Sequence, residues 1–334
     1  MTNAPVDPLV IIELTNLKAA GKLEELAKRP SLAMKPEWIR ELAKNESPGV
    51  RVALTRNLTI WDFPEIAAKL STDEDPDVRR SLASNPAIAN HPHVVGRLSK
   101  DENPWVRKAL ASNPAIAESS EVIESLLIDP NASIRQRLAQ NPALAGYPGS
   151  IDLLASDRSA TIRCAIASNP AIAESPGVID SLADDIDWGV RDCLVRNPII
   201  ISFLKAVDRL AGDKNPEIRY QLAFNPALAN FPEVVERLSN DRTNRVRQSL
   251  AANPALVDLP EIAERLANDK YYYVRLELAQ NPAIAYFPEI IEKLSKDKNK
   301  TVRQAFASSP TIPTRTTSTQ QWQAQPVSQK TPTL

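Results

Sequence analysis

The sequence is poor in the residues on which most enzyme chemistry depends. Its 334 residues include only two histidines, His91 and His93, and two cysteines, Cys164 and Cys193. The cysteines do not form a CxxC pair, so we expect structural thiols rather than a disulfide or a metal site. No Ser-His-Asp, metal-ligand or glycine-rich phosphate pattern is present. We expect no catalytic residues, no metal and no cofactor, although abundant Asp and Glu leave a carboxylate-only enzyme open.

Long apolar runs and a charge excess of one sign are also missing. The run from Leu9 to Ile12 is short and lacks the basic leader of a signal peptide. No stretch approaches the roughly 20 apolar residues that a membrane helix needs. With 40 Lys and Arg against 41 Asp and Glu, the net charge of −1 gives no overall attraction to nucleic acid or anionic membranes. We expect a cytoplasmic protein without a membrane or nucleic-acid partner.

Glycine is scarce, with 8 residues against 28 prolines, and no run shows the alternation of a β-strand. What is present instead is a repeat with a period of 28 residues, as from Asn85 to Asn113. An Asn-Pro pair marks it at Asn85, Asn113, Asn141, Asn169, Asn197, Asn225, Asn253 and Asn281. An arginine keeps the same step from Arg51 to Arg303, and an Asp stands six residues before each of them from Arg79 onward. Fixed periods of this length indicate a solenoid of stacked units.

One unit, from Pro92 to Ile116, predicts two short helices and a third turn. Pro92 suits the first turn of a helix, and Val94, Val95 and Leu98 form an apolar stripe behind it. Asp101 is interpreted as the N-cap of a second helix. That helix should stop at Asn113, because a residue before proline disfavours the α conformation. Asn113 then caps a short turn, for which we expect a 3₁₀ helix, with Ile116 pointing inward.

The ends of the chain depart from the repeat. Leu17 and Leu23 stand where the pattern would place Asp and Arg, which predicts a degenerate capping unit over residues 1–35. Residues 36–310 carry the repeats. Residues 311–334 are rich in Thr, Ser, Gln and Pro, and we expect them to be disordered. The fold class predicted is therefore all-α: an α-solenoid of about ten 28-residue helical units.

The string from Asp101 to Ala117, DENPWVRKALASNPAIA, resembles the bacterial variant leucine-rich repeat family, whose unit carries Val-Arg and Leu-Ala-x-Asn-Pro. The resemblance covers roughly residues 40–310 and implies α and 3₁₀ helices wound into a right-handed superhelix. The unit here is longer than the usual repeat of that family, so a full α-helix is expected over Pro92–Lys100. The iron–sulfur segment found in that family has no counterpart, since this chain has no cysteine cluster. The Asp-x₅-Arg spacing is also similar to HEAT repeats.

Residues that recur in every unit are interpreted as a structural ladder rather than a phosphate groove, because they meet a need that every unit has. Each Asp can accept from an Arg of its own or of a neighbouring unit, and we expect loss of Arg163 to leave Asp157 without its partner. The ladder positions are represented by Asp101, Arg107, Asn113, Asp157, Arg163, Asn169, Asp213, Arg219 and Asn225.

Function is expected where units differ. Positions two before, one after, two after and five after each Arg share one face of the second helix. Most are small or polar, but five are large and apolar: Trp105, Tyr220, Phe224, Tyr273 and Leu276. Exposed aromatic clusters anchor interfaces, whereas packing against neighbouring turns is the alternative. We expect a non-enzymatic scaffold for a protein or peptide. The alternatives are a HEAT-like nucleic-acid-binding or nucleobase-modifying protein, or an accessory protein for cofactor attachment.

Overall fold

Each 28-residue unit folds into two α-helices and a 3₁₀ helix. The computed structural model describes residues 8–19 and 21–308 of the chain, and within these residues every regular element is a helix. The prediction of an all-α repeat fold is confirmed. The expectation of disorder for 311–334 lies outside the described residues.

The elements fall into three sets. The inner helices are α2 (Leu23–Ala27), α4 (Pro48–Thr55), α6 (Pro76–Ala83), α8 (Pro104–Ala111), α10 (Ala132–Ala139), α12 (Ala160–Ala167), α14 (Trp188–Val195), α16 (Pro216–Phe224), α18 (Asn244–Ala251), α20 (Tyr272–Gln280) and α22 (Lys300–Ala307). The outer helices are α3 (Pro36–Leu42), α5 (Pro64–Leu70), α7 (Pro92–Leu98), α9 (Ser120–Leu127), α11 (Pro148–Ala155), α13 (Pro176–Ala183), α15 (Leu204–Ala211), α17 (Pro232–Ser239), α19 (Pro260–Ala267) and α21 (Pro288–Ser295). The 3₁₀ helices are η1 (Pro30–Met34), η2 (Leu58–Asp62), η3 (Pro86–Asn90), η4 (Pro114–Glu118), η5 (Pro142–Gly146), η6 (Pro170–Glu174), η7 (Pro198–Ser202), η8 (Pro226–Asn230), η9 (Pro254–Asp258) and η10 (Pro282–Tyr286). A further helix, α1 (Pro8–Ala19), precedes α2.

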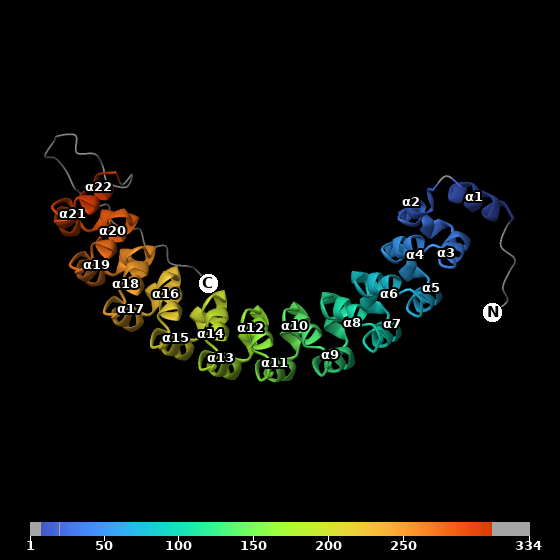
Figure 1. The fold of residues 1–334 in the computed structure, drawn as a ribbon, viewed down its shortest axis with the longest axis horizontal. Coiled ribbons are helices and arrows are strands. Elements are labelled where there is room, and N and C mark those ends of the chain that lie inside the picture. The colour runs from blue at the N-terminus through green and yellow to red at the C-terminus, as the bar shows by residue number, and fades with distance from the viewer. Residues whose placement is uncertain (1–7, 20, 309–334) are drawn as a thin grey trace, which may run out of the picture.

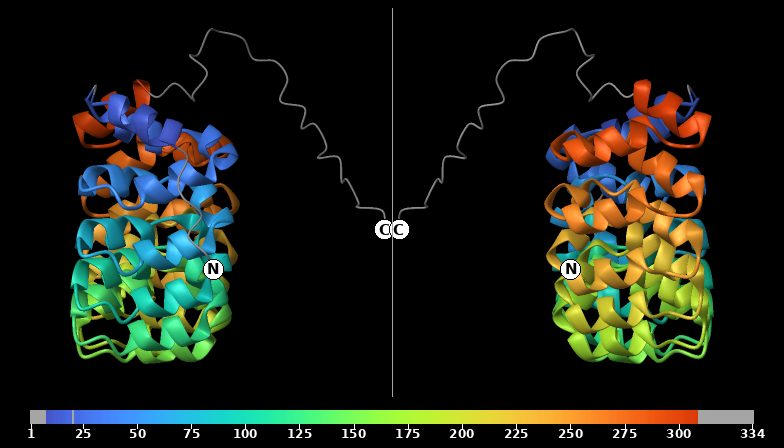
Figure 2. Two further views of the ribbon diagram at one scale, coloured as in Figure 1. Left: turned by 90° about the vertical axis from the view of Figure 1, so that its right-hand side faces the viewer. Right: turned by 90° about the vertical axis from the view of Figure 1, so that its left-hand side faces the viewer.

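The units stack into a crescent. Figure 1 shows the inner helices from α4 to α20 along its concave side and the outer helices along its convex side. Seen from either end, the units superpose within one flat slab (Figure 2). A single apolar core runs through all units from Leu23 to Val302, and Val94, Val95 and Leu98 of α7 lie in it.

The local signals work largely as the sequence predicts. Pro92 begins α7, which is a full α-helix, and Asn113 caps η4 by accepting a hydrogen bond from the backbone N–H of Ala115 at 3.0 Å. Ile116 is fully buried. The expected 3₁₀ turn after Asn113 is confirmed, and so is the expected full α-helix that begins at Pro92.

The assignment of Asp101 as a helix N-cap is wrong. The N-cap of α8 is Asn103, whose side chain accepts from the backbone N–H of Trp105. Asp101 instead lies two residues before the N-cap, in the connecting loop, where it accepts from the N–H of Asn103 at 2.9 Å. The Asp101 carboxylate also binds Arg79 of the neighbouring unit and must face that unit to do so. This contact explains why Asp101 lies before the N-cap position rather than in it.

The recurring arginines form an arginine ladder between units. In each rung the Arg donates through Nε and Nη2 to both carboxylate oxygens of the Asp 22 residues later, for Arg79 at 2.7 and 3.0 Å from Asp101. Its Nη1 donates to a backbone carbonyl of its own unit, that of Asp73. The nine pairs are Arg51–Asp73, Arg79–Asp101, Arg107–Asp129, Arg135–Asp157, Arg163–Asp185, Arg191–Asp213, Arg219–Asp241, Arg247–Asp269 and Arg275–Asp297.

The direction of the rungs corrects one expectation. Asp157 is held by Arg135 of the preceding unit, so loss of Arg163 leaves Asp185 without its partner rather than Asp157. The Arg163 side chain is 14 % exposed and that of Asp185 8 %. Paired, largely buried charges of this kind fix the register between neighbours more than they add net stability.

The asparagines form a second, parallel ladder. Asn113 donates from Nδ2 to the carbonyls of Ala83 and Asn85 in the preceding unit, both at 2.9 Å, and Asn169 does the same to Ala139 and Asn141. Asn113 is 5 % exposed. Because both ends of its amide are engaged within the solenoid, it has no free group to offer a ligand.

Candidate binding surface on the concave face

The variable positions of the sequence lie on the inner helices, which line the concave side (Figure 1). They carry small side chains on α12, in the middle of the crescent, and mostly polar or charged ones on its neighbours α10 and α14. On α12 they are Thr161, Cys164, Ala165 and Ser168. Large side chains replace these small ones on α16, α18 and α20, which lie next to one another in that order.

Helix α16 carries two aromatic side chains one turn apart. Phe224 is 61 % exposed, whereas Tyr220 is half-buried against the core. From α18, the guanidinium of Arg245 lies over the Tyr220 ring, 4.6 Å from its centroid, and pairs with Glu217 at 3.1 Å. This arrangement combines a cation–π contact with an ion pair, and it joins α16 to α18.

Helix α20 continues the same surface. Tyr273 is 48 % exposed and its ring lies 4.0 Å from that of Tyr272, while Leu276 is half-buried. Gln248 of α18 donates to Glu277 of α20 at 2.9 Å. Arg245 and Gln248 therefore connect the two aromatic helices across α18.

Four of the five residues predicted for the site share one surface: Tyr220, Phe224, Tyr273 and Leu276. We call these four residues the concave patch. Trp105 is separate. It is 60 % exposed on α8, with α10, α12 and α14 between it and α16, and its nearest cation is Lys108 of the same helix, with Nζ 5.2 Å from the ring.

Sequence reasoning missed two features near these positions. Tyr271 and Tyr272 join Tyr273 at the start of α20, and the run of three tyrosines would have shown it. A hollow of about 530 Å³ lies between α4 and α6, where Gly49 stands opposite Asp77 and Arg80. Glycine at position 49 is not the cause of this hollow, because an added Cβ there would meet the Glu24 carboxylate of α2 instead.

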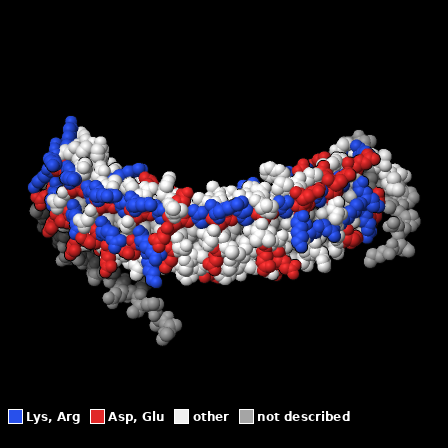
Figure 3. All heavy atoms as spheres, turned by 60° about the horizontal axis from the view of Figure 1, so that its bottom comes forward, with Lys and Arg blue, Asp and Glu red and all other residues white. Residues whose placement is uncertain are grey.

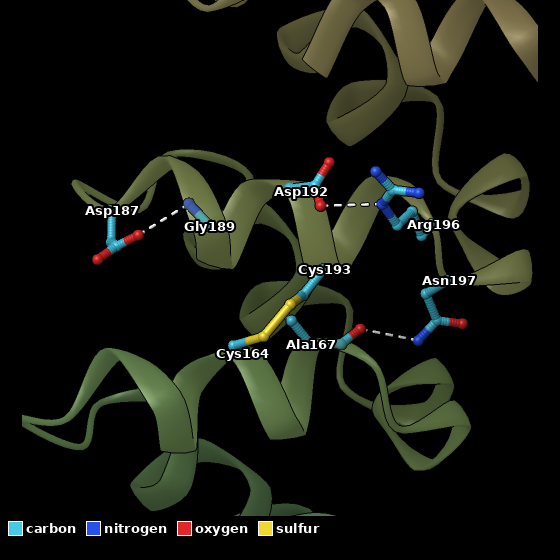
Figure 4. Close-up of a disulfide and its surroundings, with 8 residues drawn as sticks. All are labelled: Cys164, Ala167, Asp187, Gly189, Asp192, Cys193, Arg196 and Asn197. Carbon is cyan, nitrogen blue, oxygen red and sulfur yellow. Dashed lines mark hydrogen bonds and ion pairs between the residues drawn. A yellow bond between two sulfur atoms is a disulfide. The ribbon is translucent and has the colours of Figure 1, made fainter. Parts of the chain in front are cut away.

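The expectation that the two cysteines are unpaired thiols is wrong. Cys164 of α12 and Cys193 of α14 form a disulfide across the concave side (Figure 4), with Cα atoms 5.5 Å apart. They occupy different phases of the repeat, which argued against contact. Neighbouring inner helices, however, are offset so that residues 29 apart also meet, as when Ser249 donates to the Tyr220 carbonyl.

The arginine ladder is saturated by its own contacts. Burial of Asp157 opposes ionisation, but hydrogen bonds from the Arg135 side chain and the Ser159 N–H outweigh it, so the pKa of Asp157 lies below its usual value. The hydrogen bond to Asp157 raises the pKa of Arg135. Both groups stay charged and paired at neutral pH, which leaves the ladder no role in binding phosphate.

Within the part of the chain that the structure describes, no group of three or more His, Cys, Asp or Glu residues could hold a metal ion. His91 lies against Trp61, with ring centroids 4.7 Å apart. None of the helices described is both long and apolar enough to span a bilayer.

Comparisons with known proteins add little beyond shape. No family model and no curated protein matches the chain. Among solved structures it is similar to a leucine-rich repeat variant with a novel repetitive structural motif, at 19 % identity and a TM-score of 0.46 over 71 % of this chain and 88 % of that one. It is also similar to importin beta, at 12 % identity and a TM-score of 0.41 over 90 % of this chain and 50 % of that one. The fold assignment therefore depends on the helices and ladders described above.

Proposed function

We propose that the protein is a non-enzymatic repeat scaffold that binds a protein or peptide along its concave side, with the concave patch as the main contact. The observation that carries the proposal is the change in side chains along otherwise equivalent inner helices. The framework is constant, yet α16 and α20 carry partly exposed aromatic groups at positions where α12 carries small ones. Partly exposed aromatic side chains with polar neighbours are the usual anchors of protein interfaces.

The dimensions of the patch favour an extended peptide or a helix as the occupant. Neighbouring helices pack 8–10 Å apart, so α16 and α20 lie roughly 20 Å from each other. A ligand touching Phe224 and Tyr273 must bridge α18, where Arg245 and Gln248 supply polar groups. This span exceeds what a small molecule covers, and the mixture of rings and amides matches a peptide.

Peptides selected by display on the immobilised protein provide the test. The affinity of a selected peptide would be measured for the wild-type chain and for a Tyr220→Ala/Phe224→Ala variant. The matched control is Gln136→Ala/Gln140→Ala, which changes the same two positions on α10. We expect affinity to fall by more than tenfold in the first variant, as for loss of one hot spot, and to stay unchanged in the control. Equal affinity in all three proteins would refute the proposal.

A further inference from the structure

A different surface, the edge made by the loops between each outer helix and the next inner helix, carries a charge pattern that repeats with the units. We call it the loop edge. Each loop contains the buried ladder aspartate, or Asn45 in the first loop, followed by one exposed residue. In the first three full units this residue is acidic: Glu46, Glu74 and Glu102. In the last four units the same position is basic: Lys214, Arg242, Lys270 and Lys298.

The sign of this charge therefore reverses along one edge of the crescent. A band of Lys and Arg over the C-terminal half and a cluster of Asp and Glu toward the N-terminal end are visible in Figure 3. Glu74 and Glu102 lie within 3.7 Å of a ladder arginine, yet their side chains are 90 % and 91 % exposed. Glu46 pairs with Lys18 of its own chain at 3.2 Å, whereas Lys214, Arg242, Lys270 and Lys298 have no ion-pair partner among residues 8–19 and 21–308.

Two large apolar side chains lie near the centre of the loop edge, close to the charged Arg158 and Lys214. Ile186 and Ile128 are 88 % and 79 % exposed, the highest values among large apolar side chains in the described part of the chain. Ile186 occupies the same position as the charged residues, and Ile128 stands immediately before a ladder aspartate. Exposed apolar side chains surrounded by charged ones are common in protein interfaces.

We propose that two copies of this chain associate edge to edge, antiparallel, with a twofold axis at the middle of the loop edge. Such an axis places the acidic end of each copy on the basic end of the other. Every antiparallel register has a twofold axis, but one register alone overlaps all ten equivalent positions from Glu46 to Lys298, and we call it the symmetric register. It pairs Glu46 with Lys298, Glu74 with Lys270, and Glu102 with Arg242. Each pair forms twice, because a twofold interface uses the same surface on both partners.

The register follows from the positions at the centre. In the symmetric register Arg158 faces Ile186 of the second copy. A shift by one unit in one direction would place Arg158 against its own equivalent, and a shift in the other direction would place it against Lys214. Both alternatives bring like charges together, which is unfavourable.

Two further observations fit this arrangement. The symmetric register places Ile128 over Gly212, whose backbone is ordinary and whose nearest neighbour to an added Cβ would be 3.5 Å away, so the fold of one copy does not itself require glycine there. Because the units superpose end-on within one slab (Figure 2), equivalent loops of successive units follow one another along the crescent. A strip roughly 80 Å long needs a width of only about 10 Å to reach the ~800 Å² per partner of a standard interface.

Sedimentation velocity of the full chain tests the proposal, because the dimer is expected to weaken as salt rises. Glu74→Lys and Lys270→Glu would each be made alone. Either change places two like-charged pairs in the homodimer, and we expect the dissociation constant to rise on the order of tenfold or more. Lys205→Glu, on the outer helix α15, is the control for charge reversal away from the loop edge and should leave the dissociation constant unchanged.

Mixing the two single variants gives the sharpest result. In a heterodimer of Glu74→Lys with Lys270→Glu, every contact at these positions joins opposite charges, so the mixture should associate as the wild type does. A mixture of Glu102→Lys with Lys270→Glu leaves like charges opposed and should stay dissociated. A wild-type chain that is monomeric at low salt would overturn the proposal. Failure of the first mixture to associate would also overturn it, as would binding of a 20-nucleotide single-stranded DNA to the basic positions by a monomer.

Discussion

The inner helices α10 to α14 and α16 to α20 differ in what they expose and agree in what they bury. Arg135 and Arg219 make the same contacts, each to two carboxylate oxygens in the next unit and one carbonyl in its own. At the variable positions of the same helices, α10 carries Gln136 and Gln140 where α16 carries Tyr220 and Phe224. The comparison separates residues that build every unit from residues that individual units can change.

The largest expected effect is loss of stability in acid. It should destabilise both regions equally, because all nine Arg–Asp pairs need ionised aspartates. Hydrogen bonds from the arginines and from backbone N–H groups, working against burial, lower the pKa of Asp157, Asp185, Asp241, Asp269 and Asp297. A lowered pKa in the folded state stabilises the protein above the unfolded value, near 3.8, and this stability is lost as pH falls through the folded value.

Thermal melts followed by circular dichroism should therefore keep a steady midpoint from about pH 8 to about pH 5 and drop steeply below about pH 4. A midpoint that falls already between about pH 7 and about pH 5 would show that these aspartates do not dominate acid unfolding.

A change to one rung should have the next largest effect. Arg163→Ala leaves the buried Asp185 carboxylate without its partner, and breaking a buried pair in this way costs about 3 kcal/mol of unfolding free energy. Arg303→Ala is the matched control, because Arg303 is exposed and donates to the Asp297 carbonyl of its own unit. We expect that change to cost about 0.5 kcal/mol. Urea denaturation of both variants would measure the difference, and equal losses would contradict a buried ladder.

The disulfide allows a test confined to the central units. Cys193→Ser removes a crosslink between α12 and α14 that spans 29 residues. Closing a loop of that length is worth about 2–4 kcal/mol, though measured values often fall below this range. Urea midpoints with and without reductant should differ for the wild-type chain and coincide for the variant. A reductant effect that persists in Cys193→Ser would exclude this crosslink as its source.

Much of the framework could be predicted because it depends on contacts within a unit. Pro92 begins a helix, Asn113 ends one and caps the next turn, and Ile116 points inward, all from rules that act over a few residues. Contacts between units were harder to predict from the sequence. Asp157 pairs with Arg135 rather than Arg163 because of how units stack, and one-dimensional spacing does not contain that direction.

The candidate site shows the same limit. Helical spacing placed Tyr220 beside Phe224 on one helix, and the equivalence of units placed Tyr273 two helices away. Spacing could not show that Cys164 and Cys193 meet, since they differ by 29 rather than 28 residues. The offset between neighbouring helices is a property of side-chain packing, which the repeat pattern alone does not determine.

Surface changes should have the smallest effect on stability. Tyr220→Ala/Phe224→Ala should alter the unfolding free energy by about half a kcal/mol for the exposed Phe224 and somewhat more for the half-buried Tyr220. The pair Gln136→Ala/Gln140→Ala should be neutral. A loss of several kcal/mol in the first variant would show that the rings belong to the core, and the concave patch would be withdrawn.

The most direct test of the account is to measure peptide affinity and urea midpoint together for Arg163→Ala and Tyr220→Ala/Phe224→Ala. The account predicts a crossed result. The arginine variant should lose stability while its folded form keeps its affinity, and the aromatic variant should lose affinity while its midpoint barely moves. An arginine variant with reduced affinity and an unchanged midpoint would contradict the separation of framework from binding surface.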